Sequence, residues 1–355
     1  MKDFTDQVAE VRKGEELDLE AVKEFLIKEV PGLSQEITIE QFPQGHSNLT
    51  YMVKAGDREM VLRRPPFGSK VKTAHDMGRE FKVLSALHKV YPQAPRPLAF
   101  CEDESMIGAR FYVMERIKGV ILRREIPEGM DFSEKVAAGL SESFIRNLAD
   151  FHAIDYKAVG LGDLGKPDGY LKRQVWGWSD RYFGSQTDDI PEIDGIINWI
   201  KKNLPESPPP TLVHNDYKYD NLILDPHDIT KIIGVLDWEM STVGDPLSDL
   251  GGALGYWVQN DDPPELIESA FGPTFAPGSF TRKELAEHYA ELTGREVSNI
   301  HYYTCFAIFR IAVIVQQIYY RFAKGNTNDE RFAPFLDKVK LLARTAQELV
   351  TREEV

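Results

Sequence analysis

The feature that most constrains this chain is a polar stretch, 214–221, between two short apolar runs. Its Asp216 lies five residues before Asn221, and a later apolar run ends at Asp237 and Glu239. Phosphoryl transfer from a nucleotide requires a carboxylate that orients the acceptor hydroxyl and oxygen ligands for Mg²⁺. The sequence therefore predicts a fold in which buried strands fix two acidic loops.

The composition is that of a globular protein long enough for two lobes. The 355 residues are 42% apolar and 28% charged, which is typical of folded domains. The net charge of −14 argues against nucleic acid as the main partner. Cys101 and Cys305 match no metal spacing and suggest no disulfide framework, so we expect a cytoplasmic protein.

No segment predicts a membrane partner. Residues 1–16 are charged and lack the apolar core of a signal peptide. The longest apolar run, 305–315, is interrupted by Arg310 and is too short to span a bilayer, so we expect a buried helix there. A buried arginine pairs with a carboxylate or a bound anion, and for Arg310 we expect the carboxylate.

The periodicity predicts a small β-rich lobe followed by a larger, mainly helical one. Strand patterns, crossed by one helix at about 74–91, occur at about 37–42, 50–54, 59–64, 97–101 and 110–117. Helical patterns, interrupted by a strand pair within 213–237, follow at about 133–153, 170–183, 193–203, 282–292, 299–323 and 332–351. The expected fold class is α+β, with an N-lobe of 1–117, a C-lobe of 118–355 and a site in the cleft between them.

The acidic stretch resembles the protein-kinase catalytic loop, H-x-D-x-x-x-x-N, and residues 237–239 stand where those enzymes carry D-F-G. From about 37 to 322 the chain is similar to the aminoglycoside and choline phosphotransferase family, which has a bilobal protein-kinase-like fold. Within that family, 234–250 resembles the kinase-like domain that precedes some multidomain acyl-CoA dehydrogenases. The resemblance implies an ATP- and Mg²⁺-dependent phosphotransferase whose partner is a small-molecule hydroxyl acceptor.

Five polar residues of the C-lobe are candidates for the chemistry. Asp216 is the candidate base, a role that is typically worth about 10²–10⁴-fold in rate. Lys218 stands where several kinase branches reach the γ-phosphate, although a solvated lysine is the alternative. Asn221 and Asp237 are the candidate Mg²⁺ ligands because that ion prefers hard oxygens. Glu239 is either a second acidic ligand or holds a metal-bound water.

In the N-lobe, the resemblance places Arg63 where kinases carry a phosphate-pairing lysine, and Glu80 on the next helix to pair with it. Arginine is a departure from that pattern, but its planar fork can bind phosphate oxygens. The alternation of the strand leaves Arg64 as a rival. An exposed ion pair without a functional role is the other interpretation of Arg63 and Glu80.

A turn and a strand end complete the predicted nucleotide contacts. Gly45, Ser47 and Asn48 would cover the phosphates, although this turn has one glycine where protein kinases have three and also suits an ordinary hairpin. By resemblance, backbone groups of Glu115 and Ile117 would pair with the adenine edge.

Two further motifs are expected to be structural. Residues 160–167 satisfy G-x-G-x-x-G, but they follow a predicted helix and end in Pro167, so we expect a loop. Asp245 and Asp249 are expected to act as caps and structural partners, and Asp249 could accept backbone hydrogen bonds from the loop that contains Asp216.

The acceptor is the least determined part. We favour a small hydroxylated metabolite, such as a hydroxyacyl-CoA or a hydroxy acid, over an aminoglycoside. The acidic run 261–268 offers charge for a polycation but is more typical of a solvated loop. A non-catalytic nucleotide-binding pseudokinase is the other class, motivated by Arg63 and the glycine-poor turn. The sequence determines neither the preference for ATP or GTP nor the oligomeric state.

Overall fold

The computed structural model describes residues 4–43, 48–67 and 76–352. By packing, the chain forms two units. Unit 1 comprises Met1–Ile121 and Asn221–Ser241, and unit 2 comprises Leu122–Asp220 and Thr242–Val355. The predicted division at residue 117 did not anticipate that a segment from the middle of the chain would pack with the first unit.

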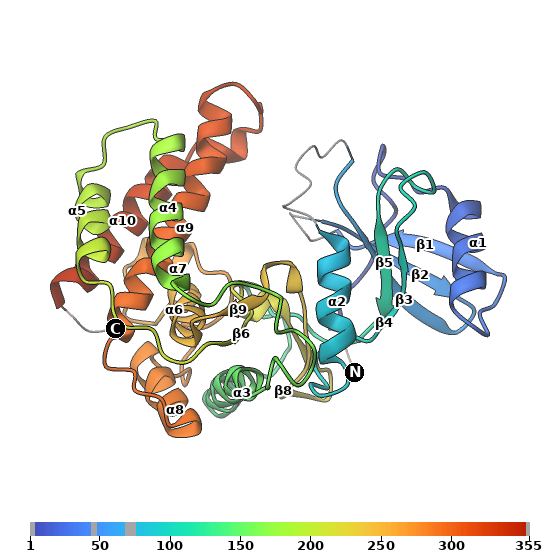
Figure 1. Cartoon of the computed structure of the whole chain (residues 1–355), viewed down its shortest axis with the longest axis horizontal. Helices are drawn as coiled ribbons and strands as arrows, with labels where there is room; N and C mark the ends of the chain where they lie inside the picture. Colours follow the sequence, from blue (N-terminus) through green and yellow to red (C-terminus); the bar gives the residue numbers. More distant parts are fainter. Residues whose placement is uncertain (1–3, 44–47, 68–75, 353–355) are drawn as a thin grey trace. The chain divides into compact units, whose positions relative to one another are not determined.

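Unit 1 is built on a five-stranded antiparallel sheet with a helix on each face (Figure 1). Its strands, in spatial order, are β1 (Ile37–Gln41), β2 (Leu49–Ala55), β3 (Arg58–Arg64), β5 (Phe111–Glu115) and β4 (Pro97–Cys101). Successive side chains of a strand point to opposite faces. Phe111 accordingly contacts Phe25 of α1 (Leu19–Glu29), whereas Tyr112 contacts Phe81 of α2 (Met77–Leu87).

The two helices of unit 1 begin at aspartate caps and bury one apolar face. Asp18 accepts a hydrogen bond from the Ala21 N–H at 3.1 Å, and Asp76 does the same for the Arg79 N–H at 3.0 Å. Such a cap is worth about 1 kcal/mol. In α1, the side chains packed on the sheet are Val22, Phe25 and Leu26. Burying each of them contributes roughly 1.5–3 kcal/mol.

A β-hairpin from the second segment completes unit 1. Its strands β7 (Leu222–Asp225) and β8 (Asp228–Val235) pair antiparallel, with Leu222 opposite Val235. The hairpin is joined to the first segment because the Val235 N–H donates to the Gln93 carbonyl at 2.8 Å. Trp238, in the short 3₁₀ helix that follows, contacts the ring of Tyr91.

Unit 2 is mainly helical, as predicted (Figure 1). Its helices are α3 (Glu134–His152), α4 (Tyr170–Ser185), α5 (Pro191–Lys202), α6 (Pro246–Tyr256), α7 (Pro264–Glu268), α8 (Arg282–Thr293), α9 (Ile300–Ala323) and α10 (Phe335–Arg352). The long helix α9 packs against α4, α6 and α10. Gly251 permits its close approach to α6, because a Cβ there would lie 2.6 Å from the Tyr303 carbonyl carbon.

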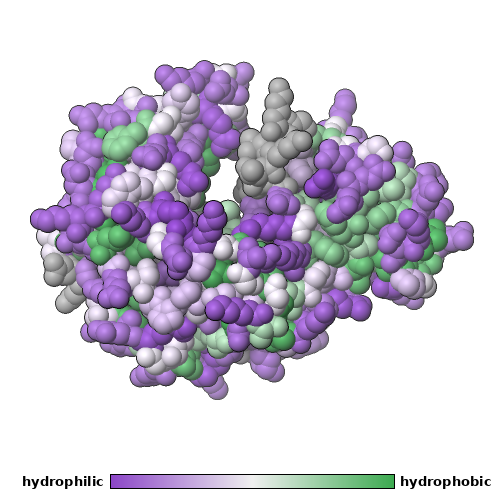
Figure 2. Space-filling view, viewed as in Figure 1, coloured by the Kyte–Doolittle hydropathy of each residue, from purple (hydrophilic) through white to green (hydrophobic). Residues whose placement is uncertain are grey.

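Helix α9 confirms the buried helix expected around Arg310. It is long and apolar enough to cross a membrane by length and composition, yet 56% of its most apolar window is buried within the protein. A core helix of this kind passes the same test as a membrane span. On the face shown in Figure 2, hydrophilic residues are spread over much of the surface, with hydrophobic residues gathered in places among them.

Some local structure departs from the sequence expectations. The strand pair expected within 213–237 is two separate ladders: β7 with β8 in unit 1, and β6 (Thr211–Val213) with β9 (Thr242–Gly244) in unit 2. Helix α6 was not predicted, because its Gly-rich sequence carries a weak helical signal. Residues 160–167 form the expected loop between α3 and α4.

Candidate active site

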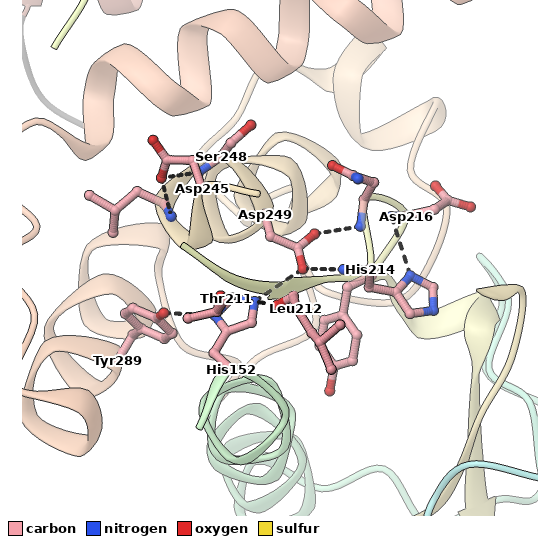
Figure 3. A network of polar contacts seen from close by, with 12 residues as sticks. His152, Thr211, Leu212, His214, Asp216, Asp245, Ser248, Asp249 and Tyr289 are labelled. Atoms are coloured by element: carbon pink, nitrogen blue, oxygen red, sulfur yellow. Dashed lines mark hydrogen bonds and ion pairs between the residues drawn. The ribbon is translucent and has the colours of Figure 1, made fainter. Parts of the chain in front are cut away.

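The loop that carries Asp216 is fixed by the buried carboxylate of Asp249, in the first turn of α6 (Figure 3). One oxygen of Asp249 accepts the backbone N–H of His214 at 2.6 Å, and the other accepts that of Asn215 at 2.6 Å. The expectation that Asp249 accepts backbone hydrogen bonds from this loop is confirmed. Two charge-assisted bonds to adjacent N–H groups fix the backbone immediately before Asp216.

His152 and Tyr289 complete the network behind Asp249 (Figure 3). His152 Nε2 lies 3.1 Å from Asp249, and its Nδ1 lies 2.7 Å from the Tyr289 hydroxyl. Burial alone would raise the pKa of Asp249, but the hydrogen bonds from His152 and from the His214 N–H prevail and lower that pKa. Asp245 caps α6, as expected, by accepting a backbone N–H at 2.9 Å.

Lys218 is directed at the candidate base. Its ammonium lies 2.9 and 3.0 Å from the two oxygens of Asp216, and 3.9 Å from the nearer oxygen of Asp220. It also lies 4.8 Å from the ring centre of Tyr256 and 5.5 Å from that of Phe271. The alternative of a solvated lysine is therefore wrong for this structure, because the side chain is held between carboxylates and aromatic rings.

The charges around Asp216 hold Lys218 in its ammonium form. Burial by itself would lower the pKa of Lys218, but Tyr256, Asp216 and Asp220 prevail and raise it well above its usual value. Burial, followed by the Asp216 carboxylate, raises the pKa of Tyr256, which keeps this phenol protonated beside the base. Burial raises the pKa of Asp220 to about 6, against the opposing effect of Lys218.

Tyr256, Phe271 and Asp220 are the residues around this loop that sequence reasoning missed. Tyr256 and Phe271 also line a small cavity of unit 2 beside Lys218. Their distance from Asp216 in the sequence gives no signal that they would meet it. Asp220 lies inside the polar stretch 214–221. Its burial is a property of the fold, which the sequence alone does not show.

In unit 1, a line of three charges leads to Asp237, the residue that follows β8 and Leu236. Arg63 donates from Nη2 to Asp237 at 2.9 Å, and its Nη1 lies 3.2 Å from Glu80. Arg63 is 8% exposed and Glu80 is 1% exposed. Burial opposes the charge on Arg63, but Glu80, Tyr112 and Asp237 prevail and raise its pKa well above the usual value.

This geometry decides between the two arginines. The predicted pairing of Arg63 with Glu80 is confirmed, and the exposed-pair interpretation is wrong because both side chains are buried. Arg64 points elsewhere: its guanidinium donates to the Ile107 carbonyl at 2.9 Å and stacks on Phe67 at 3.6 Å from the ring centre.

Asn221 and Asp237 lie at the same end of the β7–β8 hairpin. The Leu236 N–H donates to the Asn221 carbonyl at 2.8 Å, so Asn221 sits opposite the residue that precedes Asp237. An amide and a carboxylate are donors that suit Mg²⁺, which takes one or two protein ligands and completes its shell with phosphates and waters. Among the described residues, no group of three or more His, Cys, Asp or Glu side chains is arranged to hold a metal ion.

Glu239 contacts Asn48, which belongs to the turn that was predicted to cover the phosphates. The Asn48 side-chain amide donates to Glu239 at 2.7 Å, and Asn48 itself is buried. The other two predicted members of that turn, Gly45 and Ser47, lie outside the described residues. The role of Asn48 toward phosphates stays a prediction, as does that of Glu239 toward a metal.

The predicted adenine contacts lie at the end of β5. The Glu115 N–H already donates to the Arg96 carbonyl at 2.9 Å, and the Glu115 side chain pairs with that of Arg96. Ile117 follows two residues later, past the end of the strand. The recognition of adenine by these backbone groups stays a prediction.

The two acidic loops share one backbone feature. Among the described residues, Asn215 and Asp237 are the only non-glycine positions with positive φ, at 67° and 66°. This left-handed conformation is uncommon for residues with a side chain, although Asn and Asp adopt it most readily. Tyr170 supports Asn215 by donating a hydrogen bond to its side-chain oxygen at 2.8 Å.

Comparison with known proteins identifies relatives over nearly the whole chain. Residues 38–288 match the model of a family described as the phosphotransferase enzyme family. Acyl-CoA dehydrogenase family member 11 of Rattus norvegicus is 34% identical over 358 residues, which cover 99% of this chain and 45% of the relative. The corresponding protein of Homo sapiens is 32% identical over 352 residues, covering 97% and 44%. The chain thus spans less than half the length of these curated relatives.

Solved structures share the fold. A protein from Ralstonia eutropha JMP134, provisionally assigned as an aminoglycoside phosphotransferase, is 31% identical, with a TM-score of 0.81 and coverage of 95% of this chain and 99% of that one. Choline kinase from Cryptosporidium parvum is 16% identical, with a TM-score of 0.61 and coverage of 93% and 98%. An aminoglycoside phosphotransferase in complex with AMP-PNP and hygromycin B is 15% identical, with a TM-score of 0.60 and coverage of 94% and 99%. These likenesses confirm the predicted α+β, protein-kinase-like fold.

Proposed function

Because this chain belongs to the phosphotransferase enzyme family, we propose that it is an ATP- and Mg²⁺-dependent O-phosphotransferase that acts on a hydroxyl of a small molecule. The observation that carries the proposal is the charge line from Glu80 through Arg63 to Asp237 in unit 1. Buried ion pairs are weak sources of stability, because desolvation offsets much of their attraction. A buried arginine that ends on a carboxylate next to Asn221 is better explained by phosphate and metal binding.

The side chains of unit 1 would bind the nucleotide. Arg63 presents a planar fork that can hold phosphate oxygens, and Glu80 fixes the orientation of that fork. Asn221 and Asp237 would hold Mg²⁺, and Glu239 would act as a further acidic ligand or hold one of its waters. When bound, Mg²⁺ neutralises the charge of the phosphates during transfer.

The side chains of unit 2 would prepare the acceptor. Asp216 would accept a hydrogen bond from the acceptor hydroxyl and take its proton late in the reaction. Such a base typically raises the rate about 10²–10⁴-fold. Lys218 holds a positive charge beside Asp216 and would offset the charge of the transferred phosphoryl group. A phosphate would then compete with Asp216 for the Lys218 ammonium. The protonated Tyr256 adds a donor at the same carboxylate.

For the acceptor, we favour a hydroxyacyl-CoA or a hydroxy acid over an aminoglycoside. The relatives are named as acyl-CoA dehydrogenase family members, which points to acyl chemistry. A polycation would need uncommitted acidic groups, but Asp262 of the acidic run forms a bidentate pair with Arg282 at 2.6 and 3.0 Å. This pairing also corrects the expectation that the whole run is a solvated loop.

A second candidate is a non-catalytic nucleotide-binding module. It is favoured by the contact of Arg63 with Asp237, since an arginine that occupies a metal ligand could support nucleotide binding without metal. Thermal shifts with ATP separate the two: the enzyme predicts stabilisation that needs Mg²⁺, and the module predicts stabilisation without it.

The direct test is a screen for ADP release. Hydroxy acids, hydroxyacyl-CoAs and aminoglycosides would be added to the protein with ATP and Mg²⁺, with Asp216→Ala protein as the control. We expect acceptor-dependent ADP release from one of the acyl classes by the wild type alone. Equal release by Asp216→Ala would count against the assignment.

A further inference from the structure

Arg310 is a buried cation without an acidic partner. It lies in the middle of α9 and is 8% exposed. A guanidinium carries five N–H donors. The Nε of Arg310 is buried without a hydrogen-bond partner, and its Nη2 makes one long contact, 3.5 Å, with the Asn215 carbonyl. Most of its donor capacity is therefore unused.

The carboxylate that we expected for Arg310 is not there. Within residues 4–43, 48–67 and 76–352, no acidic side chain lies at ion-pair distance from its guanidinium. Aromatic rings surround it instead, with Trp178 at 5.4 Å and Phe306 at 5.9 Å from ring centre to guanidinium carbon. Ring faces attract a cation but do not accept its in-plane hydrogen bonds, so burying this charge without an anion is costly.

A second arginine adds positive charge at the same indole. Arg181 of α4 stacks on Trp178 with its guanidinium carbon 4.5 Å from the ring centre. Its side chain is exposed, and no acidic side chain among the described residues forms an ion pair with it. The Trp178 ring is thus contacted by a buried and an exposed cation, both of which favour the approach of an anion.

Arg310 lies beside the loop of the candidate base. The Asn215 carbonyl that it contacts belongs to the residue before Asp216, and adjacent Cα atoms are about 3.8 Å apart. Tyr256 is affected by both charges, because Asp216 raises its pKa and Arg310 lowers it. An anion bound by Arg310 would therefore lie beside the loop that carries Asp216.

We propose that Arg310 binds an oxyanion of the acceptor, a carboxylate or a phosphate, and so selects short hydroxylated acids. The planar guanidinium can donate two parallel hydrogen bonds to such a group, which is the geometry that distinguishes arginine from lysine. The inference rests on the proposed function and narrows its acceptor class. A CoA thioester of the same acid carries a neutral carbonyl in place of the carboxylate and would bind less well at this position.

The test compares matched acids and neutral diols. Calorimetry with the full chain would measure the binding of C2 to C6 hydroxy acids, of the diols in which the carboxylate is reduced to a hydroxymethyl group, and of inorganic phosphate. Because a hydrogen-bonded charge pair is worth about 10- to 100-fold in affinity, the best acid should exceed its diol by that factor in the wild type. Arg310→Gln should remove the preference, and Arg310→Lys should retain part of it. Arg321→Gln, on the exposed end of the same helix, should leave it unchanged.

The outcomes separate this inference from the proposed function. Equal binding of every acid and its diol by the wild type, or an unchanged preference in Arg310→Gln, overturns the anion site. Binding of phosphate but of no carboxylate assigns the site to a phosphate ester. Acid binding that depends on Arg310, without any ADP release from MgATP, would support the anion site while refuting phosphotransfer. The wild-type comparison stands even where Arg310→Gln fails to fold.

Discussion

The two acidic loops of this protein are held in different ways. In unit 1, the carboxylate of Asp237 is held directly by the side chain of Arg63, which Glu80 holds in turn. In unit 2, Asp249 holds the backbone of the loop through the N–H groups of His214 and Asn215 and makes no bond to the Asp216 carboxylate.

The difference matches the chemistry proposed for each loop. A metal ligand must stay ionised and keep a fixed position, and a cation such as Arg63 favours both. A base must give its carboxylate to the acceptor, so its backbone is fixed while its side chain contacts the side chains of Lys218 and Tyr256, which an acceptor could replace. The loop of Asp237 should therefore respond to changes of charge, and the loop of Asp216 to changes of backbone support.

Removing either functional carboxylate should have the largest effect. Asp216→Ala and Asp237→Ala are each expected to lower turnover by about 10³-fold or more, because one loses the base and the other several kcal/mol of metal-dependent charge stabilisation. ADP release with the best acceptor is the measurement, and circular dichroism checks that the fold persists. Turnover within about tenfold of the wild type in either variant would break the assignment of that loop.

Removing the positive charge of Arg63 in unit 1 should have the next largest effect. Arg63→Gln leaves Glu80, which is 1% exposed, as a buried charge without its partner, at a cost of about 3–5 kcal/mol in the free energy of unfolding. Arg63→Lys keeps the charge and should cost less. Urea unfolding measures both, with Arg58→Gln at the other end of the same strand as the control. A loss no larger than that of the control would show that the charge line is not a support of this loop.

Removing the carboxylate of Asp249, which supports the Asp216 loop in unit 2, should lower the free energy of unfolding slightly less than removing Arg63 does. Asp249→Asn replaces an acceptor oxygen by an N–H donor that faces backbone N–H groups, and we expect a loss of roughly 2–4 kcal/mol in the free energy of unfolding. Asp216→Asn, the same chemical change in the supported loop, should lose less than about 1 kcal/mol. Denaturation of the two variants side by side sharpens the contrast, and it fails if Asp216→Asn is the less stable protein.

The smallest expected effect is the loss of the contribution of Asp249 to the free energy of unfolding when acid protonates its carboxylate. Its pKa is lowered in the folded protein, so its contribution to stability is present above the unfolded value of 3.8 and is lost as the pH falls through the folded value. The difference in unfolding free energy between wild type and Asp249→Asn should thus be constant near neutral pH and shrink below pH 3.8. A difference that grows in acid would give Asp249 the opposite sign of linkage.

The sequence predicted the parts of the site that depend on local pattern. Strand alternation left Arg63 and Arg64 both open, and the structure selects Arg63 because only its side chain faces α2 and Glu80. The interaction of Asp249 with the base loop was anticipated from its motif. Side-chain directions that depend on distant elements were not predictable: Lys218 is positioned by Tyr256 and Phe271, which a different part of the chain supplies.

Arg310 shows the same limit of prediction from the sequence. Burial of the helix followed from its apolar run, but the choice between a carboxylate and an anion depends on what the other helices bring to that position. Helix α4 brings the ring of Trp178, whereas Phe306 belongs to α9 itself, one turn before Arg310. No local pattern in the sequence of α9 could have indicated the approach of Trp178.

The binding of MgATP to two variants tests most directly the claim that the loop of Asp237 binds the metal and the loop of Asp216 binds the acceptor. Calorimetry would measure the affinity of Asp216→Ala and Asp237→Ala for ATP in the presence of Mg²⁺. We predict wild-type affinity for Asp216→Ala and a loss of about tenfold or more for Asp237→Ala, since only the latter removes a metal ligand. Full affinity in Asp237→Ala together with weakened binding in Asp216→Ala would contradict the account.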